Sequence, residues 1–292
     1  MLNSDLRPIL VRGMSRSGGT LLCTLLDAHP DVSFSFELYP NLLLLEQPID
    51  QMALARSFAG TSSLKEAAAL APTPRFGTFI NRLPRGGLDA DDFAELLKRA
   101  TKEGSRLTEL KGCMRVMQLC CELKQSRDQT QRWGLKCNNA VEAYLDVFPN
   151  AQFVDIIRDG RDVLASQKNT GAFNPEVSAL ANSWMKTHQK FERLRKDYPD
   201  QIMIIRYEDL TMRPIETTQE LCNFLNLPFV NEMLQFHEMD LTVFKTRHLS
   251  LNRITKKIDA TKIGRWKTEL TQEEVATFAE IASEFMKEWG YE

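Results

Sequence analysis

The residues best suited to chemistry lie close to the N-terminus, in a short run rich in glycine and hydroxyl side chains. Residues 13–20 read GMSRSGGT, follow the apolar run ILVR at 9–12 and lead directly into an apolar helical segment. A strand, a turn of small residues and a helix N-terminus together direct unpaired N–H groups and the positive end of the helix dipole at one point. Arg16 adds a permanent charge and a fork of donors. The run therefore predicts a site for phosphate or a similar anion, formed by Arg16, Ser17, Gly18, Gly19, Thr20 and Leu21.

Two features separate this run from the phosphate loop of nucleotide triphosphatases. That loop follows the pattern GxxxxGK[ST], in which the lysine reaches the β/γ-phosphates and the hydroxyl binds Mg²⁺. Here no lysine follows the glycines, and the strand-like run at 153–158 ends in Arg158 before Asp159. We therefore expect no metal and a leaving group that is neutralised by cations. There are three alternatives: an ordinary turn with a solvated arginine, a P-loop-type kinase that uses ATP, and a nucleotide-binding protein without catalysis.

A second candidate anion site lies in the run FVDIIRDGRDVLASQ at 153–167. Arg158 ends a strand, and Ser166 follows eight residues later, after about two turns of the next helix. Both side chains can then face one phosphate beside the carboxyl edge of the sheet. Taken alone, the run is only a charged helix start, in which Asp159 and Asp162 interact favourably with the helix dipole.

Short β-rich runs alternate with helical patterns, which predicts an α/β fold of three layers (αβα) around a central parallel sheet. Helices are expected at 20–28, at 175–195 with His188 as a core histidine on the apolar face, and at 271–289 after a cap-like TQEE. The expected strands are 9–12, 32–37, 133–136, 153–158 and 202–207.

Between residues 40 and 131 the pattern loosens, which indicates a helical insertion on the acceptor side of a single domain, 1–292. Such an insertion either forms a substrate lid or simply packs extra helices. Helical pieces are expected around 42, 62–70, 90–100 and 114–124, with Pro/Gly breaks at 71–77 and 83–87.

The composition is that of an ordinary globular protein, with 43% hydrophobic and 26% charged residues. The formal net charge of −2 provides no global basic field for nucleic acid or an acidic membrane, so an anionic ligand needs a local cluster of donors. The six cysteines show no CxxC pair or zinc-like spacing and are expected to be free thiols. No signal peptide or membrane-length apolar run is evident, so we expect a cytoplasmic protein. A homodimer stays open.

The opening run PILVRGMSRSGGTLLCTLLDAHPDVSFSFE at 8–37 resembles that of sulfotransferases that use 3′-phosphoadenosine-5′-phosphosulfate (PAPS). The resemblance is to the branch of tyrosylprotein sulfotransferases and many bacterial relatives, whose loop has the form P-R-S-G-T-T-L. It implies a fold like that of P-loop nucleotide hydrolases, with the loop holding the 5′-phosphosulfate. Gly19 departs from the family pattern because it replaces a threonine, which removes one hydroxyl.

The same resemblance implies roles for residues further along the chain, and the matches run in family order from Pro8 to Lys267. Arg158 and Ser166 would bind the 3′-phosphate, and Lys136 in the run GLK would reach the bridging oxygen and 5′-phosphate of the donor. In RYEDL at 206–210, Tyr207 would lie near the adenosine, while Glu208 and Asp209 are expected to cap the next helix. The run KKIDATKIGRWK at 256–267 would close over the nucleotide with Lys256, Lys257, Lys262 and Gly264.

Sulfonate transfer needs positioning, proton removal and charge neutralisation. By resemblance, the catalytic residues would be Arg16, Lys136 and Glu37, with Glu37 as general base at the end of the second strand. His29 is the alternative base, although its place before Pro30 favours a structural role. The reaction would leave the adenosine bisphosphate PAP. The acceptor would be a hydroxyl or amine of a small molecule, a lipid or polyketide, or a carbohydrate. The leucines of 42–45 slightly favour an apolar one.

Overall fold

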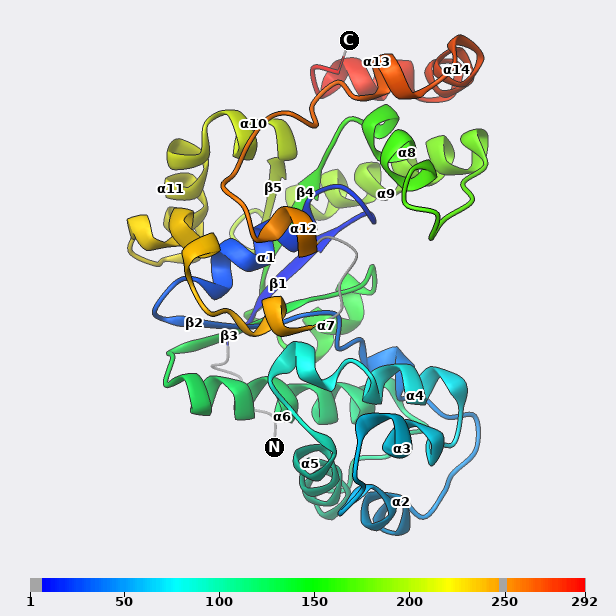
Figure 1. Cartoon of the computed structure of the whole chain (residues 1–292), viewed down its shortest axis with the longest axis vertical. Helices are drawn as coiled ribbons and strands as arrows, with labels where there is room; N and C mark the ends of the chain where they lie inside the picture. The colour runs from blue at the N-terminus through cyan, green and yellow to red at the C-terminus, as the bar shows by residue number, and fades with distance from the viewer. Residues whose placement is uncertain (1–6, 247–250, 292) are drawn as a thin grey trace.

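The computed structural model describes residues 7–246 and 251–291, and its centre is a five-stranded parallel sheet in the order β2-β3-β1-β4-β5 (Figure 1). Every strand pair is parallel, with β1 in the middle between β3 and β4. The predicted α/β fold with a central parallel sheet is confirmed, and so are all five predicted strands. Their bounds are β1 Ile9–Gly13, β2 Val32–Ser35, β3 Arg132–Lys136, β4 Gln152–Ile157 and β5 Ile202–Arg206.

Helices cover both faces of the sheet, which gives the three predicted layers (Figure 1). Apolar side chains of α1 and α11 pack on one face, and those of α6, α7 and α9 pack on the other. The helices outside the insertion are α1 Gly19–Asp27, α7 Val141–Val147, α8 Gly160–Lys168, α9 Val177–Asp197, α10 Tyr207–Met212, α11 Pro214–Leu225, α12 Leu251–Ile254, α13 Trp266–Glu269 and α14 Gln272–Glu288, with the 3₁₀ helices η3 Asn231–Glu238 and η4 Thr242–Lys245.

The central strands are apolar because both of their faces are covered. All six residues of β4 are buried, and its one charged residue, Asp155, is paired on both sides. Arg12 Nη1 lies 2.9 Å from Asp155 Oδ1, and His188 Nδ1 lies 3.1 Å from Asp155 Oδ2. His188 is therefore a buried core histidine, as its place on the apolar face of its helix predicts.

The insertion between β2 and β3 forms a helical group that lies at the lower end of the molecule in Figure 1. Four phenylalanines pack together inside it, and its core is continuous with that of the sheet. The predicted break at 71–77 is present but shorter, since α3 ends at Ala69 and residues 74–77 already belong to α4. Thr73 caps α4, and Pro74 occupies its first position, where a missing N–H costs nothing. The helices of the insertion are η1 Pro40–Leu42, α2 Gln51–Phe58, α3 Leu64–Ala69, α4 Pro74–Ile80, η2 Leu83–Gly86, α5 Ala90–Lys102 and α6 Leu110–Asp128.

At the C-terminal end, α14 packs against α8 and α9 around the buried indole of Trp184. The expected cap of α14 is present: Thr271 accepts from the Glu274 N–H, and Glu274 accepts from the Thr271 N–H. All six cysteines are buried thiols without a disulfide, as predicted. Within the described ranges, no helix has both the length and the apolarity to cross a bilayer.

Candidate active site

A cavity of about 300 Å³ opens beside the carboxyl ends of β1 and β4, where open parallel sheets usually bind ligands. We call it the donor cavity. It brings together most of the predicted binding residues from five separate stretches of the chain. These are Arg16, Gly18, Gly19, Thr20, Leu21, Lys136, Arg158, Ser166, Tyr207, Lys256, Lys257 and Lys262.

The loop between β1 and α1 forms the floor of the donor cavity, and its backbone explains its sequence. Gly18 has a left-handed φ of 98°, and a Cβ there would lie 2.5 Å from Cδ2 of Tyr207, so only glycine fits. The first bond of α1 runs from the Leu22 N–H to the Gly18 carbonyl. The first-turn N–H groups before Leu22 therefore have no partner within the helix and suit an anion.

Three predicted site residues do not line this cavity: Ser17, Gly264 and the candidate base Glu37. The Ser17 side chain is fully buried, its N–H donates to Met14 O, and its Oγ atom has no hydrogen-bond partner among the described residues. Gly264 has a φ of 70°, and its N–H donates to Asp162 Oδ2 at 2.9 Å. Gly264 therefore helps to hold the segment 256–267 in position, whereas the family resemblance implied a contact with the nucleotide.

Positive charge is concentrated on the donor cavity. Eight of its lining residues are Arg or Lys, and Asp259 is the one acidic residue among those lining it. Burial and then the neighbouring guanidiniums of Arg265 and Arg158 lower the pKa of Arg16. Like charges held this close favour an anionic ligand, since an anion relieves their repulsion. The cations are Arg16, Lys136, Arg158, Arg253, Lys256, Lys257, Lys262 and Arg265.

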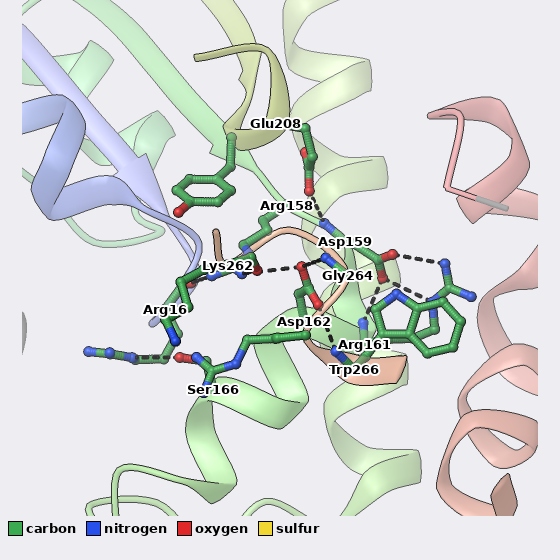
Figure 2. Close-up of polar contacts among 12 residues, drawn as sticks. Arg16, Arg158, Asp159, Arg161, Asp162, Ser166, Glu208, Lys262, Gly264 and Trp266 are labelled. Atoms are coloured by element: carbon green, nitrogen blue, oxygen red, sulfur yellow. Dashed lines mark hydrogen bonds and ion pairs between the residues drawn. The ribbon is translucent and has the colours of Figure 1, made fainter. Parts of the chain in front are cut away.

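The segment 256–267 is fastened over the cavity mainly by Asp162, on the first turn of α8 (Figure 2). Its carboxylate accepts the N–H groups of Gly264 and Trp266 at 2.9 and 3.0 Å and pairs with Arg158 at 3.2 Å. Arg158 also donates to the carbonyl of Lys262 and to that of Arg16, the latter at 3.3 Å. One arginine thus links the loop after β1 with the segment that covers the cavity.

The predicted capping of the helix after β5 by Glu208 and Asp209 is wrong, because α10 has no side-chain cap. Asp159, for which only a favourable interaction with the helix dipole was expected, caps α8: its side chain accepts from the Arg161 N–H at 2.9 Å. Glu208 accepts instead from the Asp159 N–H at 3.0 Å (Figure 2). It also accepts from the Tyr291 hydroxyl at 3.0 Å. The carboxylate therefore joins three segments instead of satisfying its own helix.

Glu37 lies two residues beyond the end of β2, not within the strand as its sequence position suggests, and has a left-handed φ of 61°. Its Oε1 lies 2.8 Å from Lys136 Nζ, which itself lies 3.1 Å from Thr20 Oγ1 at the start of α1. The Glu37 carboxylate thus contacts the Lys136 ammonium group, which in turn contacts the anion-binding loop at Thr20. This arrangement can move a proton at one end and neutralise charge at the other.

The other oxygen of Glu37 is bound by Arg85, which comes from η2 in the insertion. Arg82 of the same turn donates to the Glu37 carbonyl at 3.0 Å, and Phe36 donates its N–H to the Arg85 carbonyl at 3.2 Å. Sequence reasoning missed both arginines. Only the run LPRGG at 83–87, which contains Arg85 and directly follows Arg82, marked the turn, and no motif connected it with Glu37.

His29 has both ring nitrogens in structural hydrogen bonds. Its Nε2 lies 2.8 Å from the carbonyl of Pro228, and its Nδ1 accepts the Asp31 N–H at 3.0 Å. The ring is buried and does not line the donor cavity. These contacts favour the structural interpretation of His29 over that of a base.

A second cavity, of about 600 Å³, also borders the loop after β1, where Gly13, Met14 and Ser15 line it. Met14 lines both cavities, and Cys137, which directly follows Lys136, lines the second one. We call it the second cavity. No residue of 40–131 lines either cavity. Within the described residues, the insertion contacts the site through Arg82 and Arg85, which bind Glu37, and through Asn41, which accepts from Asn138 at 3.1 Å.

Over the described ranges 7–246 and 251–291, no cluster of three or more His, Cys, Asp or Glu side chains is arranged to hold a metal ion.

Solved structures with similar folds include two sulfotransferase domains. The domain from the curacin biosynthetic pathway has a TM-score of 0.62 and 21% identity, covering 97% of this chain and 98% of that one. The domain from the olefin synthase of Synechococcus PCC 7002 has a TM-score of 0.61 and 17% identity, with the same coverage. At these identities the likeness establishes the fold.

Curated relatives carry the name protein-tyrosine sulfotransferase. The protein from Drosophila melanogaster is 22% identical over 293 residues, covering 96% of this chain and 51% of the relative. Protein-tyrosine sulfotransferase 1 from Danio rerio is 26% identical over 265 residues, covering 88% of this chain and 62% of the relative. The chain thus spans between half and two thirds of the length of these relatives.

The profile described as "Sulfotransferase family" matches residues 8–231, which includes the loop after β1, Glu37, Lys136, Arg158 and Tyr207. With most of its length matched and its fold shared with solved sulfotransferase domains, this chain belongs to the sulfotransferase family.

Proposed function

We propose that the protein transfers a sulfonate group from PAPS to a hydroxyl or amine of an acceptor. The observation that carries the proposal is the position of Lys136. Its ammonium group lines the donor cavity and bonds both Thr20 in the anion-binding loop and the Glu37 carboxylate. One side chain therefore connects the place for a leaving phosphate with a candidate base.

The donor cavity suits a nucleotide that carries more than one phosphate. Its walls offer eight cationic side chains, which is more than one phosphate group requires. Buried polar atoms without partners among the described residues, Ser17 Oγ and Arg158 Nε, also lie at the loop and at the end of β4. These groups fit PAPS, with Arg158 and Ser166 at the 3′-phosphate and the loop with Lys136 at the 5′-phosphosulfate.

In the proposed reaction PAPS supplies the sulfonate, and the protein positions it and balances charge. Glu37 takes the proton of the acceptor hydroxyl as the acceptor oxygen bonds to sulfur. Lys136 and Arg16 neutralise the negative charge that the leaving phosphate oxygen gains as its bond to sulfur breaks. A positioned base of this kind is worth about 10²–10⁴ in rate.

A P-loop-type kinase using ATP is the second candidate, because the fold class also binds nucleoside triphosphates. The two proposals differ in ligand preference. PAP should raise the melting temperature without metal, whereas a kinase should be stabilised by ATP with Mg²⁺, since a ligand that binds only the folded state stabilises it. Stabilisation by PAP without turnover of any acceptor would favour a non-catalytic nucleotide-binding protein.

Replacing Glu37 by glutamine tests the chemistry. Glu37→Gln keeps the shape of the side chain but cannot accept the proton, so turnover should fall about 10²-fold or more while PAP affinity stays within a fewfold of wild type. Glu46→Gln, on the exposed surface, is the matched control. A folded, PAP-binding Glu37→Gln enzyme with near-normal turnover would refute the assignment, and His29→Ala would then be tested next.

The acceptor classes that we propose are small molecules, lipid or polyketide alcohols, and carbohydrates, although relatives are named for protein tyrosine. We also retain the cytoplasm as the proposed location. Six buried cysteines without a disulfide are typical of a reducing compartment.

A further inference from the structure

We propose that the second cavity binds the acceptor and that the acceptor is an uncharged, hydroxyl-rich molecule of the neutral carbohydrate class. This inference rests on the proposed sulfonate transfer and adds the substrate class to it. Three features of the second cavity support it: its position, its lack of charge and its supply of hydrogen-bonding groups.

The position follows from the residues that the two cavities share. Met14, in the loop after β1, lines both, and the chain passes from Lys136 in the donor cavity to Cys137 in the second cavity. Tyr39, two residues after Glu37, also lines the second cavity. A molecule there adjoins the donor cavity at Met14 and at the step from Lys136 to Cys137, and it lies near the segment that carries Glu37, which itself lines neither cavity. In-line transfer requires an acceptor site that adjoins the donor site in this way.

Charge is absent from the walls of the second cavity. None of its lining residues is Asp, Glu, Lys, Arg or His, in contrast to the eight cations of the donor cavity. Burial raises the pKa of the Cys137 thiol to about 12, and burial followed by the charge of Glu37 raises the pKa of the Tyr39 phenol. Both side chains are neutral at physiological pH. An anionic acceptor would thus lose water without gaining a counter-charge, and acidic motifs are normally recognised by arginine clusters.

Hydrogen-bonding groups make up much of the remaining wall. Asn139, Ser183 and Thr187 have no side-chain hydrogen bond among the described residues, so their donors and acceptors are available. Asn138 and Gln167 are already bonded to Asn41 Oδ1 and the Ser15 carbonyl, which fixes their orientation. A wholly apolar acceptor would leave the first three unpaired, and sites built to bind hydroxyl groups reject molecules that lack them.

The leucines that slightly favoured an apolar acceptor do not contribute to this wall. Leu43 and Leu45 belong to the insertion and are buried in its apolar core, and no residue of 42–45 lines the second cavity. Phe173 provides one apolar surface, against which the C–H face of a sugar ring can pack while its hydroxyls meet the amides. An uncharged sugar therefore matches both parts of the wall.

The test is transfer of labelled sulfonate from PAPS to four acceptor types: neutral mono- and disaccharide glycosides, a uronate-containing disaccharide, an acidic tyrosine peptide and a long-chain alcohol. We expect kcat/KM for neutral glycosides to exceed that for each other type at least ~10²-fold. Absence of transfer to every neutral glycoside, or a preference for any other type, overturns the acceptor class. Protection of the fold by PAP is measured in parallel and reports separately on the proposed donor site.

A charge placed in the wall gives a second, independent readout. Thr187→Lys, on α9, should improve transfer to the uronate relative to the neutral sugar by ~10-fold or more, because it supplies the missing counter-charge. Gln189→Lys, two residues further along and outside the lining, is the matched control and should leave the ratio unchanged. An equal ratio in Thr187→Lys and wild type, with both proteins folded, would overturn the placement of the acceptor in this cavity.

Discussion

Arg16 Nε lies 3.1 Å from Ser166 Oγ, so two motifs 150 residues apart in the sequence meet at one wall of the donor cavity (Figure 2). Arg158, which the sequence groups with Ser166, also donates to the Arg16 carbonyl. The parallel sheet explains the meeting, because β1 and β4 are neighbours and their carboxyl ends lead into the loop and α8. The two predicted phosphate sites are therefore adjacent parts of one surface.

Loss of the Arg158 guanidinium should remove the preference for a 3′-phosphate. Arg158→Ala should lower the ratio of PAP to 5′-AMP affinity by roughly 10- to 100-fold, since a hydrogen bond to a charged group is worth about 1.5–3 kcal/mol. Calorimetry with both nucleotides measures the ratio, and Arg195→Ala on the exposed surface of α9 is the control. An unchanged ratio in Arg158→Ala would show that the 3′-phosphate lies elsewhere.

Turnover should survive removal of divalent metal. The proposed transition state is neutralised by side chains, namely Lys136, Arg16 and the N–H groups at the start of α1, so EDTA should change the rate less than twofold. The measurement is sulfonate transfer after dialysis against chelator, with and without added Mg²⁺. Activity that disappears with EDTA and returns with Mg²⁺ would support phosphoryl transfer instead.

The sequence predicted the parts of the site that depend on local pattern. The five strands, the helix after the loop and the cap at Thr271 all follow from short runs, because strand burial and helix capping are local properties. It did not predict that Asp162 holds the segment 256–267, or that Arg85 binds Glu37. Those contacts join residues 102 and 48 positions apart, and no local pattern connects side chains so distant in the sequence.

The buried carboxyl of Glu208 should make stability depend on pH. The pKa of Glu208 is raised above the ordinary value for a glutamate, and burial is the main cause. A raised folded-state pKa means that the folded protein holds the proton more tightly than the unfolded chain. The resulting stabilisation is complete below the unfolded pKa of about 4.3 and is lost as pH rises through the folded pKa.

Glu208→Gln removes this titration while keeping an acceptor for the Asp159 N–H and a partner for the Tyr291 hydroxyl. The free energy of unfolding of the wild type, relative to that of Glu208→Gln, should therefore fall as pH increases from about 4 to 7. Each unit of pKa difference corresponds to about 1.4 kcal/mol. Denaturant titrations at several pH values measure the difference. A difference that stays constant or grows with pH would contradict the raised pKa.

Arg85 should act on turnover through Glu37, without contact with the nucleotide. Its guanidinium binds Glu37 Oε2, while Lys136 binds Oε1, and Arg85 does not line the donor cavity. Without Arg85, the carboxylate would keep its contact with Lys136 and lose the contact that fixes its direction. Arg85→Ala should then lower kcat by about 10- to 100-fold, part of what a positioned base contributes, and leave PAP affinity within a fewfold.

A purely structural role for Arg85 predicts a different pattern. Its carbonyl already accepts the Phe36 N–H, and Arg82 of the same turn holds the Glu37 carbonyl, so the backbone of η2 keeps its main contacts in any side-chain variant. Arg85→Lys retains one cation beside Glu37 and should recover part of the lost kcat, whereas it cannot reproduce the fork of the guanidinium. Arg56→Ala, on the exposed surface of α2, is the control for charge removal in the insertion. If kcat, PAP affinity and melting temperature fall together in Arg85→Ala, and Arg85→Lys recovers none of them, Arg85 only supports the fold. If kcat alone falls and Arg85→Lys restores part of it, the insertion between β2 and β3 serves catalysis by holding the base.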